Sequence, residues 1–441
     1  MTHRLPRRAA LLLPLGALSG CGLLDDVFGP DKPSLPGRRE AVLAARRGLD
    51  VDPADRGPIA LPPPAPAQEW PQAGGGPAHA PGNLAITGLN PAWSASVGRG
   101  GGYRRRLTAQ PVVAGGRVFA MDSDADVGAF DLASGGRLWR RDTQDKGDRS
   151  TNIGGGIAVE GGTIYATTGR ADALALDAAT GEVRWRKPLG SPARSAPTLV
   201  DGRVFATTLD GNLLCLDAAS GERQWAYQAE AEATTLLASP APAYAEGLVV
   251  AGFGSGEIVA VRADSGGLAW SDSLASARGR NSLLDLSAIR AAPVVDRGRV
   301  YAVGVGGLLV ALDLRSGRRL WEREAGGGET PAIAGDWLFV LTSEQTLAAI
   351  GREDGRVRWT RELPRYGDPR RQRDPIAWTG PLLANSQLLL AGSNEQMTAV
   401  DAATGEVVGT QRLADPVSVP PLAAGGTVLV LADDGTLQAF R

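Results

Sequence analysis

Three aspartates at alternate positions are the first candidates for chemistry in this chain. Asp122, Asp124 and Asp126 have the spacing that opens the calcium-binding loop of an EF-hand. The pattern then fails, because the glycine falls one place late, at Gly128, and Ala133 stands where the loop needs a bidentate glutamate. We therefore interpret the segment as a solvated turn between two strands and predict no metal site.

The residues that enzymes use most often are scarce. Both histidines, His3 and His79, precede the repeats described below, so a Ser-His-Asp or Cys-His nucleophile and a His-ligated zinc or copper centre lack their base or ligand there. The glycine runs at 98–102 and 154–156 have no helical pattern after them and are not phosphate loops. Cys215 stands alone in a strand pattern and is predicted to be a core residue. We predict no catalytic residue, no cofactor and no cofactor-binding residue.

Charge excludes one class of partner. The formal net charge is −2 over 441 residues, so the protein has no strong positive potential that would attract nucleic acid. Arginines do cluster at 104–106 and at 370–373. We interpret both clusters as solvated loops, with a partner contact as the alternative.

A repeat organises most of the chain. Seven times a small residue, an apolar residue and usually an aspartate are followed by a turn glycine, and in six of these copies a tryptophan comes next. A repeat of about 40 to 50 residues made only of strands is typical of a β-propeller. The copies have their turn glycine and tryptophan at Gly135 and Trp139, Gly181 and Trp185, Gly221 and Trp225, Gly266 and Trp270, Gly317 and Trp321, and Gly355 and Trp359, while the last has Gly405 with Gly409 in place of the tryptophan.

The third copy shows one repeat as a blade of four antiparallel strands. Strand patterns cover Pro197–Val200, Arg203–Thr208, Asn212–Asp217 and Glu222–Ala226. Asp201-Gly202 predicts a type I′ turn between the first two. The tryptophans are expected to fill the wedge between adjacent blades, where a buried indole covers roughly 150–250 Å².

The two ends of the repeat region complement each other. Residues 91–98, which include Trp93, read as an outermost strand with no blade before it, and residues 427–440 read as inner strands with no tryptophan strand after them. We predict an all-β, eight-bladed propeller of four-stranded antiparallel blades, in which the N-terminal strand completes the last blade and closes the ring. Seven blades are the alternative.

The first residues have the pattern of a bacterial lipoprotein signal. Basic residues from Arg4 to Arg8 precede a short apolar run, and small residues lead to Cys21. The run is too short to span a bilayer. We predict a signal peptide at 1–20 and lipidation of Cys21 by acyl chains such as palmitate. Gly22 follows in place of the aspartate that retains such proteins at the inner membrane, which favours the outer membrane.

A tether is predicted between the lipid and the ring. Residues 21–85 are rich in proline, glycine and alanine, and Leu61–Pro66 reads as a stiff, extended spacer. In an alternative reading, Trp70–His79 docks on the propeller rim through its tryptophan. The predicted domains are therefore the signal peptide at 1–20, the tether at 21–85 and the propeller at 86–441.

Long connections predict a partner-binding face. The segments at 141–153, 227–237, 272–290 and 361–377 all follow an outermost strand, so they emerge on one face of the ring. Two that flank the same blade carry apolar residues with no evident core role, which are Leu236 and Leu237 in one, and Leu283, Leu284, Leu286 and Ile289 in the next. We expect them to bind a partner; packing on the blade tops is the alternative.

A resemblance to a known family rests on three segments. The lipobox ending at Cys21, the Ala-Trp-Ser-x-Ser-Val-Gly stretch at 92–98 and the Ala-Leu-Asp-Leu-Arg-Ser-Gly stretch at 311–317 resemble the BamB family of lipoprotein propellers. The resemblance runs from about residue 86 to the end. It implies an eight-bladed, non-enzymatic scaffold without cofactors, anchored by lipid at the periplasmic face of the outer membrane. It also implies binding to the periplasmic POTRA domains of BamA and help in inserting nascent outer-membrane β-barrel proteins.

The family contacts BamA through two loops, one with a leucine–arginine stretch and one with aspartates. Leu236 matches one of the leucines, whereas Leu237 stands where the arginine is expected. Ala288 and Arg290 stand where the acidic residues are expected. The resemblance thus adds Arg290 to the predicted partner residues, with charge pairing that differs from the family pattern.

Two other functions compete with the scaffold. Pyrroloquinoline quinone (PQQ)-dependent dehydrogenases share the tryptophan repeat, but the enzymes that resemble this chain use a calcium site with an aspartate base, and many have adjacent cysteines. The chain has two cysteines, Cys21 and Cys215, which are not adjacent, and shows no such carboxylate constellation. The third candidate is a periplasmic sensor or binding propeller.

Overall fold

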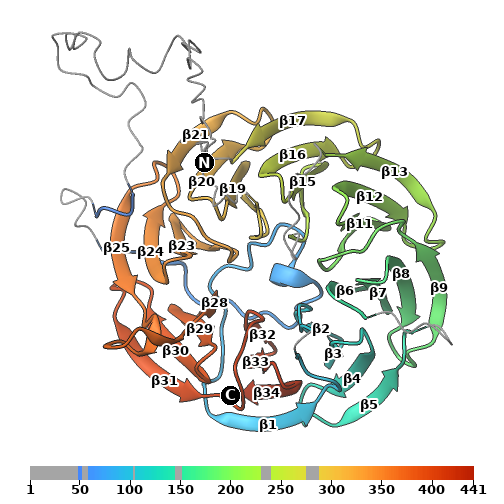
Figure 1. Cartoon of the computed structure of the whole chain (residues 1–441), viewed down its shortest axis with the longest axis horizontal. Coiled ribbons are helices and arrows are strands. Elements are labelled where there is room, and N and C mark those ends of the chain that lie inside the picture. Colours follow the sequence, from blue (N-terminus) through green and yellow to red (C-terminus); the bar gives the residue numbers. More distant parts are fainter. Residues whose placement is uncertain (1–47, 52–57, 103–104, 145–150, 230–239, 275–287) are drawn as a thin grey trace, which may run out of the picture. The chain divides into compact units, whose positions relative to one another are not determined.

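The protein forms a ring of eight four-stranded antiparallel sheets (Figure 1). The structure is a computed structural model that describes residues 48–51, 58–102, 105–144, 151–229, 240–274 and 288–441. All of these belong to one compact unit, residues 45–441. The eight sheets confirm the predicted eight-bladed propeller and exclude the seven-bladed alternative.

Each of the first four blades takes four consecutive strands, ordered from the axis outward. They are blade 1, with β2 (Val112–Ala114), β3 (Arg117–Met121), β4 (Val127–Asp131) and β5 (Arg137–Arg141); blade 2, with β6 (Gly155–Glu160), β7 (Thr163–Thr168), β8 (Asp172–Asp177) and β9 (Val183–Pro188); blade 3, with β10 (Thr198–Val200), β11 (Arg203–Thr207), β12 (Asn212–Asp217) and β13 (Arg223–Gln228); and blade 4, with β14 (Ala243–Ala245), β15 (Leu248–Gly252), β16 (Glu257–Arg262) and β17 (Leu268–Ser273).

The next three blades repeat this order. They are blade 5, with β18 (Val294–Asp296), β19 (Arg299–Val303), β20 (Leu309–Asp313) and β21 (Arg319–Arg323); blade 6, with β22 (Ala332–Ala334), β23 (Trp337–Leu341), β24 (Thr346–Gly351) and β25 (Val357–Glu362); and blade 7, with β28 (Trp378–Ala384), β29 (Gln387–Gly392), β30 (Gln396–Asp401) and β31 (Val407–Arg412). A hairpin of β26 (Tyr366–Asp368) and β27 (Arg373–Pro375) separates blades 6 and 7.

Blade 8 closes the ring with strands from both ends of the repeat region. Its inner strands are β32 (Leu422–Ala424), β33 (Thr427–Leu431) and β34 (Thr436–Phe440), and its outermost strand is β1 (Pro91–Ser96). Trp93 pairs with Ala439 across the β1–β34 ladder. The closure predicted from the sequence is therefore confirmed.

The blade pattern read from the third repeat is also confirmed. Asp201 and Gly202 have φ of +50° and +72°, and positive φ at both central residues is what a type I′ turn requires. The only helix among the described residues is a three-residue 3₁₀ turn, η1 (Ala73–Gly75). Consequently none of the described helices is long and apolar enough to cross a membrane.

Tryptophan side chains lock neighbouring blades together. Trp270 of blade 4 donates its indole N–H to the Leu314 carbonyl of blade 5 at 2.7 Å, and its ring lies on Gly317, where a β-carbon would come within 2.6 Å of it. Gly317 has φ +69°, which favours glycine. The same pairing of indole with carbonyl and turn glycine joins Trp93 to Leu132 and Gly135, Trp139 to Ala178 and Gly181, Trp185 to Ala218 and Gly221, Trp225 to Ala263 and Gly266, Trp321 to Arg352 and Gly355, and Trp359 to Ala402 and Gly405.

The junction between blades 7 and 8 is the exception. Gly409 occupies the tryptophan register position in β31, opposite Ala399. Blade 8 offers no turn glycine there, because its third and fourth strands, β34 and β1, are not consecutive in the chain. The missing tryptophan and the missing turn therefore have one cause, which is the closure of the ring.

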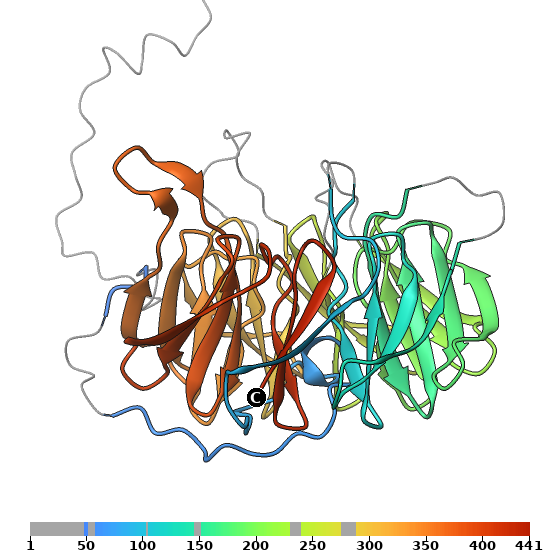
Figure 2. The ribbon, with the colours of Figure 1, turned by 90° about the horizontal axis from the view of Figure 1, so that it is seen from below.

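Residues 58–90, which we call the strap, lie against the ring. They run along one face of the propeller and place η1 near the axis (Figures 1 and 2). We predicted a tether at 21–85, and its residues 58–85 are instead part of the packed structure. Trp70 is 3% exposed and docks at the inner strand β2, not on the rim.

The strap touches every blade. Trp70 exchanges two backbone hydrogen bonds of 2.8 Å with Val113 in β2. The edges of the innermost strands face the axis and carry peptide groups that need partners, and the strap supplies these. Its other contacts are Pro71 with Val159, Gln72 with Leu199, Pro77 with Tyr244, Ala78 with Val295, Pro62 with Gly335, Leu84 with Leu383 and Ala67 with Gly425.

Candidate functional site

The face opposite the strap carries the connections between blades, and we call it the loop face. The β26–β27 hairpin projects from it (Figure 2). Arg370, Arg371 and Arg373 of this hairpin are exposed. Of these three, only Arg371 has an ion pair in the described structure, to Asp368 at 3.9 Å. The cluster predicted at 370–373 thus lies on the expected face.

The two predicted partner loops are anchored on either side of blade 4. The first lies between Ala229 and Pro240, and the second between Leu274 and Ala288. Ala229 is tied by its N–H to the Gly211 carbonyl at 2.9 Å, and Leu274 to the Gly256 carbonyl at 2.8 Å. These anchors bracket β14–β17, so the described ends of both segments lie at the same blade.

The predicted partner residues have different outcomes. Leu236, Leu237 and Leu286 lie outside the described residues, as does Cys21. Ile289 is fully buried; it bridges to Gly304 and donates its N–H to the Phe253 carbonyl at 3.0 Å. Its side chain lies in the core between blades 4 and 5. Ile289, which we expected at a partner surface, therefore has no exposed surface for a partner to contact. Apolarity alone cannot distinguish these two roles.

Arg290 is exposed on the loop face, one residue from this anchor. Its side chain lies over Gly328, next to Glu329. A Glu329 carboxylate oxygen accepts hydrogen bonds from the Thr379 hydroxyl at 2.7 Å and the Gly380 N–H at 3.1 Å. Burial raises the pKa of Glu329, and the Thr379 and Gly380 hydrogen bonds and the positive charge of Arg290 act against that rise. Arg290 therefore presents a guanidinium at the inner edge of the loop face, beside the Glu329 carboxyl group, which also accepts hydrogen bonds from Thr379 and Gly380.

A cavity of about 210 Å³ lies on the axis above the strap. Trp70, Gly74 and His79 of the strap contribute to its lining, together with Arg194 and Arg290. The wall is largely proline and small residues from the starts of the inner strands, which include Ala196, Pro240, Ala241, Ala292, Pro331, Pro381, Pro420 and Pro421.

This cavity does not fit a quinone and calcium. Calcium takes six to eight oxygen ligands, usually with several carboxylates, and the lining residues include neither aspartate nor glutamate. Within the described ranges no three His, Cys, Asp or Glu side chains are grouped to hold a metal ion. The strap also fills the axial space from one side.

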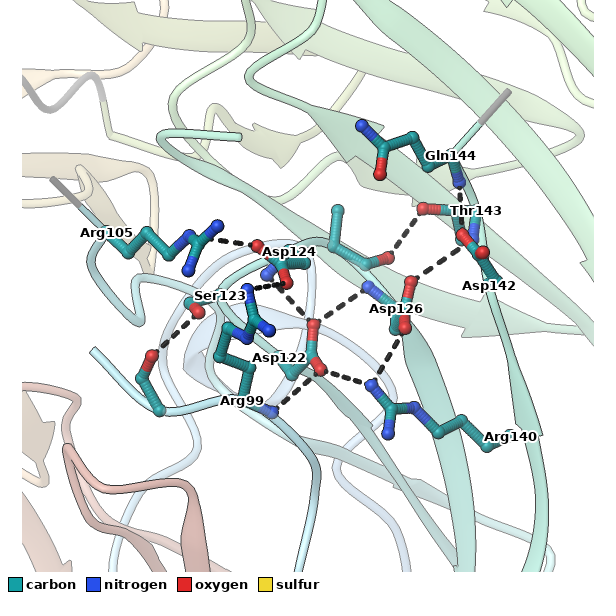
Figure 3. Close-up of polar contacts among 12 residues, drawn as sticks. Arg99, Arg105, Asp122, Ser123, Asp124, Asp126, Arg140, Asp142, Thr143 and Gln144 are labelled. Atoms are coloured by element: carbon teal, nitrogen blue, oxygen red, sulfur yellow. Dashed lines mark hydrogen bonds and ion pairs between the residues drawn. The ribbon is translucent and has the colours of Figure 1, made fainter. Parts of the chain in front are cut away.

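The Asp122–Asp126 turn, singled out above for its spacing, is a structural joint (Figure 3). The Asp122 side chain is fully buried. One of its oxygens accepts the backbone N–H groups of Asp124 and Asp126 at 2.9 and 3.0 Å. The other accepts the Arg99 N–H and the Arg140 guanidinium, both at 2.9 Å. With both oxygens committed to donors, the turn ties the β1–β2 connection to blade 1.

Replacing Asp122 with alanine is expected to destabilise the propeller by about 3 kcal/mol, because four hydrogen bonds lose their buried acceptor. Asp124→Ala is the matched control. Asp124 forms exposed ion pairs with Arg99 and Arg105 at 3.2 and 3.1 Å, which contribute less than about 1 kcal/mol. Urea denaturation followed by circular dichroism would measure both. Equal losses in the two variants would contradict the assignment of Asp122 as the joint.

Cys215 is enclosed between blades. It has no exposed surface, as predicted, and burial raises the pKa of its thiol to about 12. A thiol in that state holds almost no thiolate at neutral pH and is a poor nucleophile.

Sequence reasoning missed the packed role of the strap. Within a proline- and glycine-rich stretch, Trp70, Gln72, His79 and Asn83 are large or polar and all are buried. His79 directs Nδ1 at the Pro293 carbonyl at 2.8 Å, and Asn83 donates to the Pro62 carbonyl at 2.9 Å. The recurrence of such large or polar residues among small ones is the sequence signal that could have indicated a packed segment.

Comparisons with known proteins agree with the fold. The sequence profile of the family described as outer membrane protein assembly factor BamB matches residues 81–143, 123–361 and 370–441. Outer membrane protein assembly factor BamB of Salmonella typhimurium is 32% identical over 356 residues, covering 79% of this chain and 88% of the relative. That of Alkalilimnicola ehrlichii is 38% identical over 350 residues, covering 79% and 87%.

Solved structures show the same architecture. BamB from Moraxella catarrhalis superposes with a TM-score of 0.68 at 18% identity, covering 80% of this chain and 99% of that one. A quinohemoprotein alcohol dehydrogenase from Comamonas testosteroni has the same TM-score at 16% identity, covering 85% and 81%. At these identities the superpositions speak for the fold, which scaffolds and enzymes share.

Proposed function

The chain belongs to the BamB family of outer membrane protein assembly factors, and we propose that it acts there as a non-catalytic scaffold bound to BamA. In this proposal the periplasmic POTRA domains of BamA dock on the loop face at the flanks of blade 4. The scaffold holds BamA while nascent outer-membrane proteins insert. One observation carries the proposal: two long connections leave the ring on either side of one blade, with Arg290 exposed at the end of the second.

The partner surface combines apolar and charged side chains. In the proposed surface the apolar side chains are Leu236, Leu237 and Leu286, and the charged side chain is Arg290. Apolar anchors and arginine are the residue types that contribute most at protein interfaces. Since Arg290 is basic, the proposed partner surface on BamA is acidic.

The anchor is the second part of the proposal. Cys21 carries the lipid and holds the protein at the periplasmic face of the outer membrane. Several acyl chains on one residue give stable membrane attachment without a membrane-spanning helix. The residues between Cys21 and Leu49, which packs against the ring, then form the tether, which is shorter than the 21–85 segment first predicted.

The absence of catalysis is the third part. The axial cavity that a quinoprotein would use for its cofactor is closed on one side by the strap and lined without carboxylates. Incubation with PQQ and calcium followed by a dye-linked dehydrogenase assay separates the enzyme from the scaffold. Dye reduction above that of a heat-denatured control would support the enzyme.

Leu236→Asp and Arg290→Glu are expected to weaken capture of the BamA periplasmic domains at least tenfold, since losses of about 2 kcal/mol are typical at interface anchors. The melting temperature is expected to fall by no more than a few degrees, because Arg290 is exposed and its interaction with Glu329 is electrostatic. Pull-down and titration calorimetry with purified BamA periplasmic domains measure the binding. Arg223→Glu is the control, since Arg223 is an exposed arginine on β13 of blade 3. Undiminished capture by both test variants would refute the proposed surface and favour a sensor or binding propeller.

A further inference from the structure

The rim of the propeller is made of eight outermost strands, and each of them has one edge without a partner in its own sheet. Free edges invite pairing with other chains, and proteins guard them with charges and proline. Charged residues occur within β5, β9, β13, β17, β21 and β25. In β1 no residue is charged, but the strand begins with Pro91 and is otherwise mostly alanine and serine.

The β31 edge of blade 7 has a charged residue only at its end. Its sequence from Val407 to Gln411 is uncharged, and only the last residue, Arg412, carries a charge. Val407 and Val408 are 50% and 52% exposed. Gly409 replaces the tryptophan, and a β-carbon there would meet no atom within 4 Å. The exposed β-branched valines of β31 are residues that favour a paired, half-buried strand.

The equivalent edge in blade 6 already has one. Val357 in β25 holds the register position that Val407 holds in β31, since each pairs with the residue just after the bulge, Ile350 and Val400. Val51 forms a parallel bridge to Val357, and Leu49 packs against the same core cluster. Val357 has no exposed surface. The short stretch near residue 50 lies beside β25 in Figure 1.

This chain thus shows the same edge position in two states. Val357 is covered where Val51 forms an isolated bridge to the outermost strand, and Val407 is half-exposed where the described structure has no such bridge. Other exposed aliphatics of the rim are Leu138, Val183 and Leu268. Leu138 and Val183 lie in β5 and β9, which have three charged residues each, and Leu268 lies in β17, which has one. Among the described rim strands, only β31 places two exposed valines side by side. The geometry that accepts Val51 in blade 6 is therefore available at β31, whose single charged residue is the last one.

We propose that the free edge of β31 binds an extended segment of another polypeptide as an additional strand. The expected segment is uncharged and alternates apolar and polar residues, so that apolar side chains cover Val407 and Val408 while its backbone pairs with β31. Such alternation is a property of strands that form membrane β-barrels. The inference deepens the proposed function by naming the class of client segment, and it places that segment away from the loop face.

The test uses the full chain and a fluorescein-labelled peptide of about nine residues with alternating valine and threonine, roughly one strand length. Fluorescence anisotropy measures binding. Val407→Lys and Val408→Lys are each expected to weaken binding about tenfold, since a covered valine contributes about 1.5 kcal/mol. Val183→Lys is the matched control, because Val183 holds the same repeat position in β9 and is 42% exposed. It is expected to leave binding unchanged.

A second peptide separates strand pairing from general apolar adhesion. The same sequence with N-methyl groups on alternate amides keeps its side chains but loses backbone donors, and it is expected not to bind. Equal binding of the two peptides, or equal effects of Val183→Lys and Val408→Lys, would overturn the proposal. If the protein forms a dimer and Val408→Lys abolishes that dimer, the edge binds a second copy of this chain, and the proposal is overturned as well. BamA is absent from this assay, so failure of the proposed BamA contact leaves its outcome unaffected.

Discussion

Trp270→Ala is expected to lower the free energy of unfolding by about 3–5 kcal/mol, the range for removing a large aromatic side chain from a core. The indole is 7% exposed and spans blades 4 and 5. Its loss removes the 2.7 Å hydrogen bond to Leu314 and leaves a void over Gly317. Urea denaturation followed by far-ultraviolet circular dichroism measures the change without depending on tryptophan fluorescence.

The partner of this lock provides a second variant. Gly317→Ala alone is expected to be destabilising, since its φ is +69° and the new β-carbon would lie 2.6 Å from the Trp270 ring. In the double variant the clash is gone, so the two losses should not add. Trp337→Ala is the control, because this half-buried ring only borders a core cluster and lies under the Arg358 guanidinium at 5.0 Å. Its loss should therefore cost less than that of the buried Trp270 indole. A Trp270→Ala loss no larger than that would disprove the lock.

Acidification from pH 6.5 to pH 4 is expected to weaken docking of the strap by about 3 kcal/mol. Burial lowers the pKa of His79 to about 4 from its usual 6.5, because the docked site excludes water from the charged imidazolium. A released strap binds the proton below pH 6.5, and the docked strap does not. Its contribution is therefore complete above pH 6.5 and falls at about 1.4 kcal/mol per pH unit until pH 4.

Amide hydrogen exchange would detect this release. The Tyr244 and Val295 N–H groups donate to strap carbonyls at 2.7 and 2.9 Å, so their protection should fall with pH more steeply than that of the inner-strand amides of β11. His79→Gln keeps a donor for the Pro293 carbonyl without a titrating group, and its protection should be flat between pH 6.5 and 4. Identical profiles in the two proteins would exclude His79 as the cause.

The repeat carried enough information to predict the ring. Turn glycines, tryptophans and strand alternation are local signals, and the count of outer strands that included Trp93 identified the eighth blade. Val97 and the residues before it were assigned to closure because no blade precedes them, and the β1–β34 ladder confirms that assignment. The blade pattern was read from residues close together in sequence, and the closure from two incomplete fragments that complement each other.

The strap and Ile289 could not be predicted in the same way. A proline- and glycine-rich segment has the same composition whether it is a free spacer or a packed one, and the difference lies in the strand edges around the axis. Those edges exist only after the ring has formed. Likewise, we predicted Ile289 at a partner surface because it is an apolar residue in a long loop. No pattern within that loop indicates that its side chain packs between blades 4 and 5.

The strap is made before any of the strands to which it binds. Its hydrogen-bonded partners run from Val113 in blade 1 to Gly425 in blade 8, so a chain that emerges from its N-terminus first must wait for nearly its whole length before this segment can seat. A partly built propeller lacks some of those docking points and leaves the segment loose. Seating of residues 58–90 therefore reports that assembly is finished, and proteases that attack loose chain would remove the unfinished molecules first.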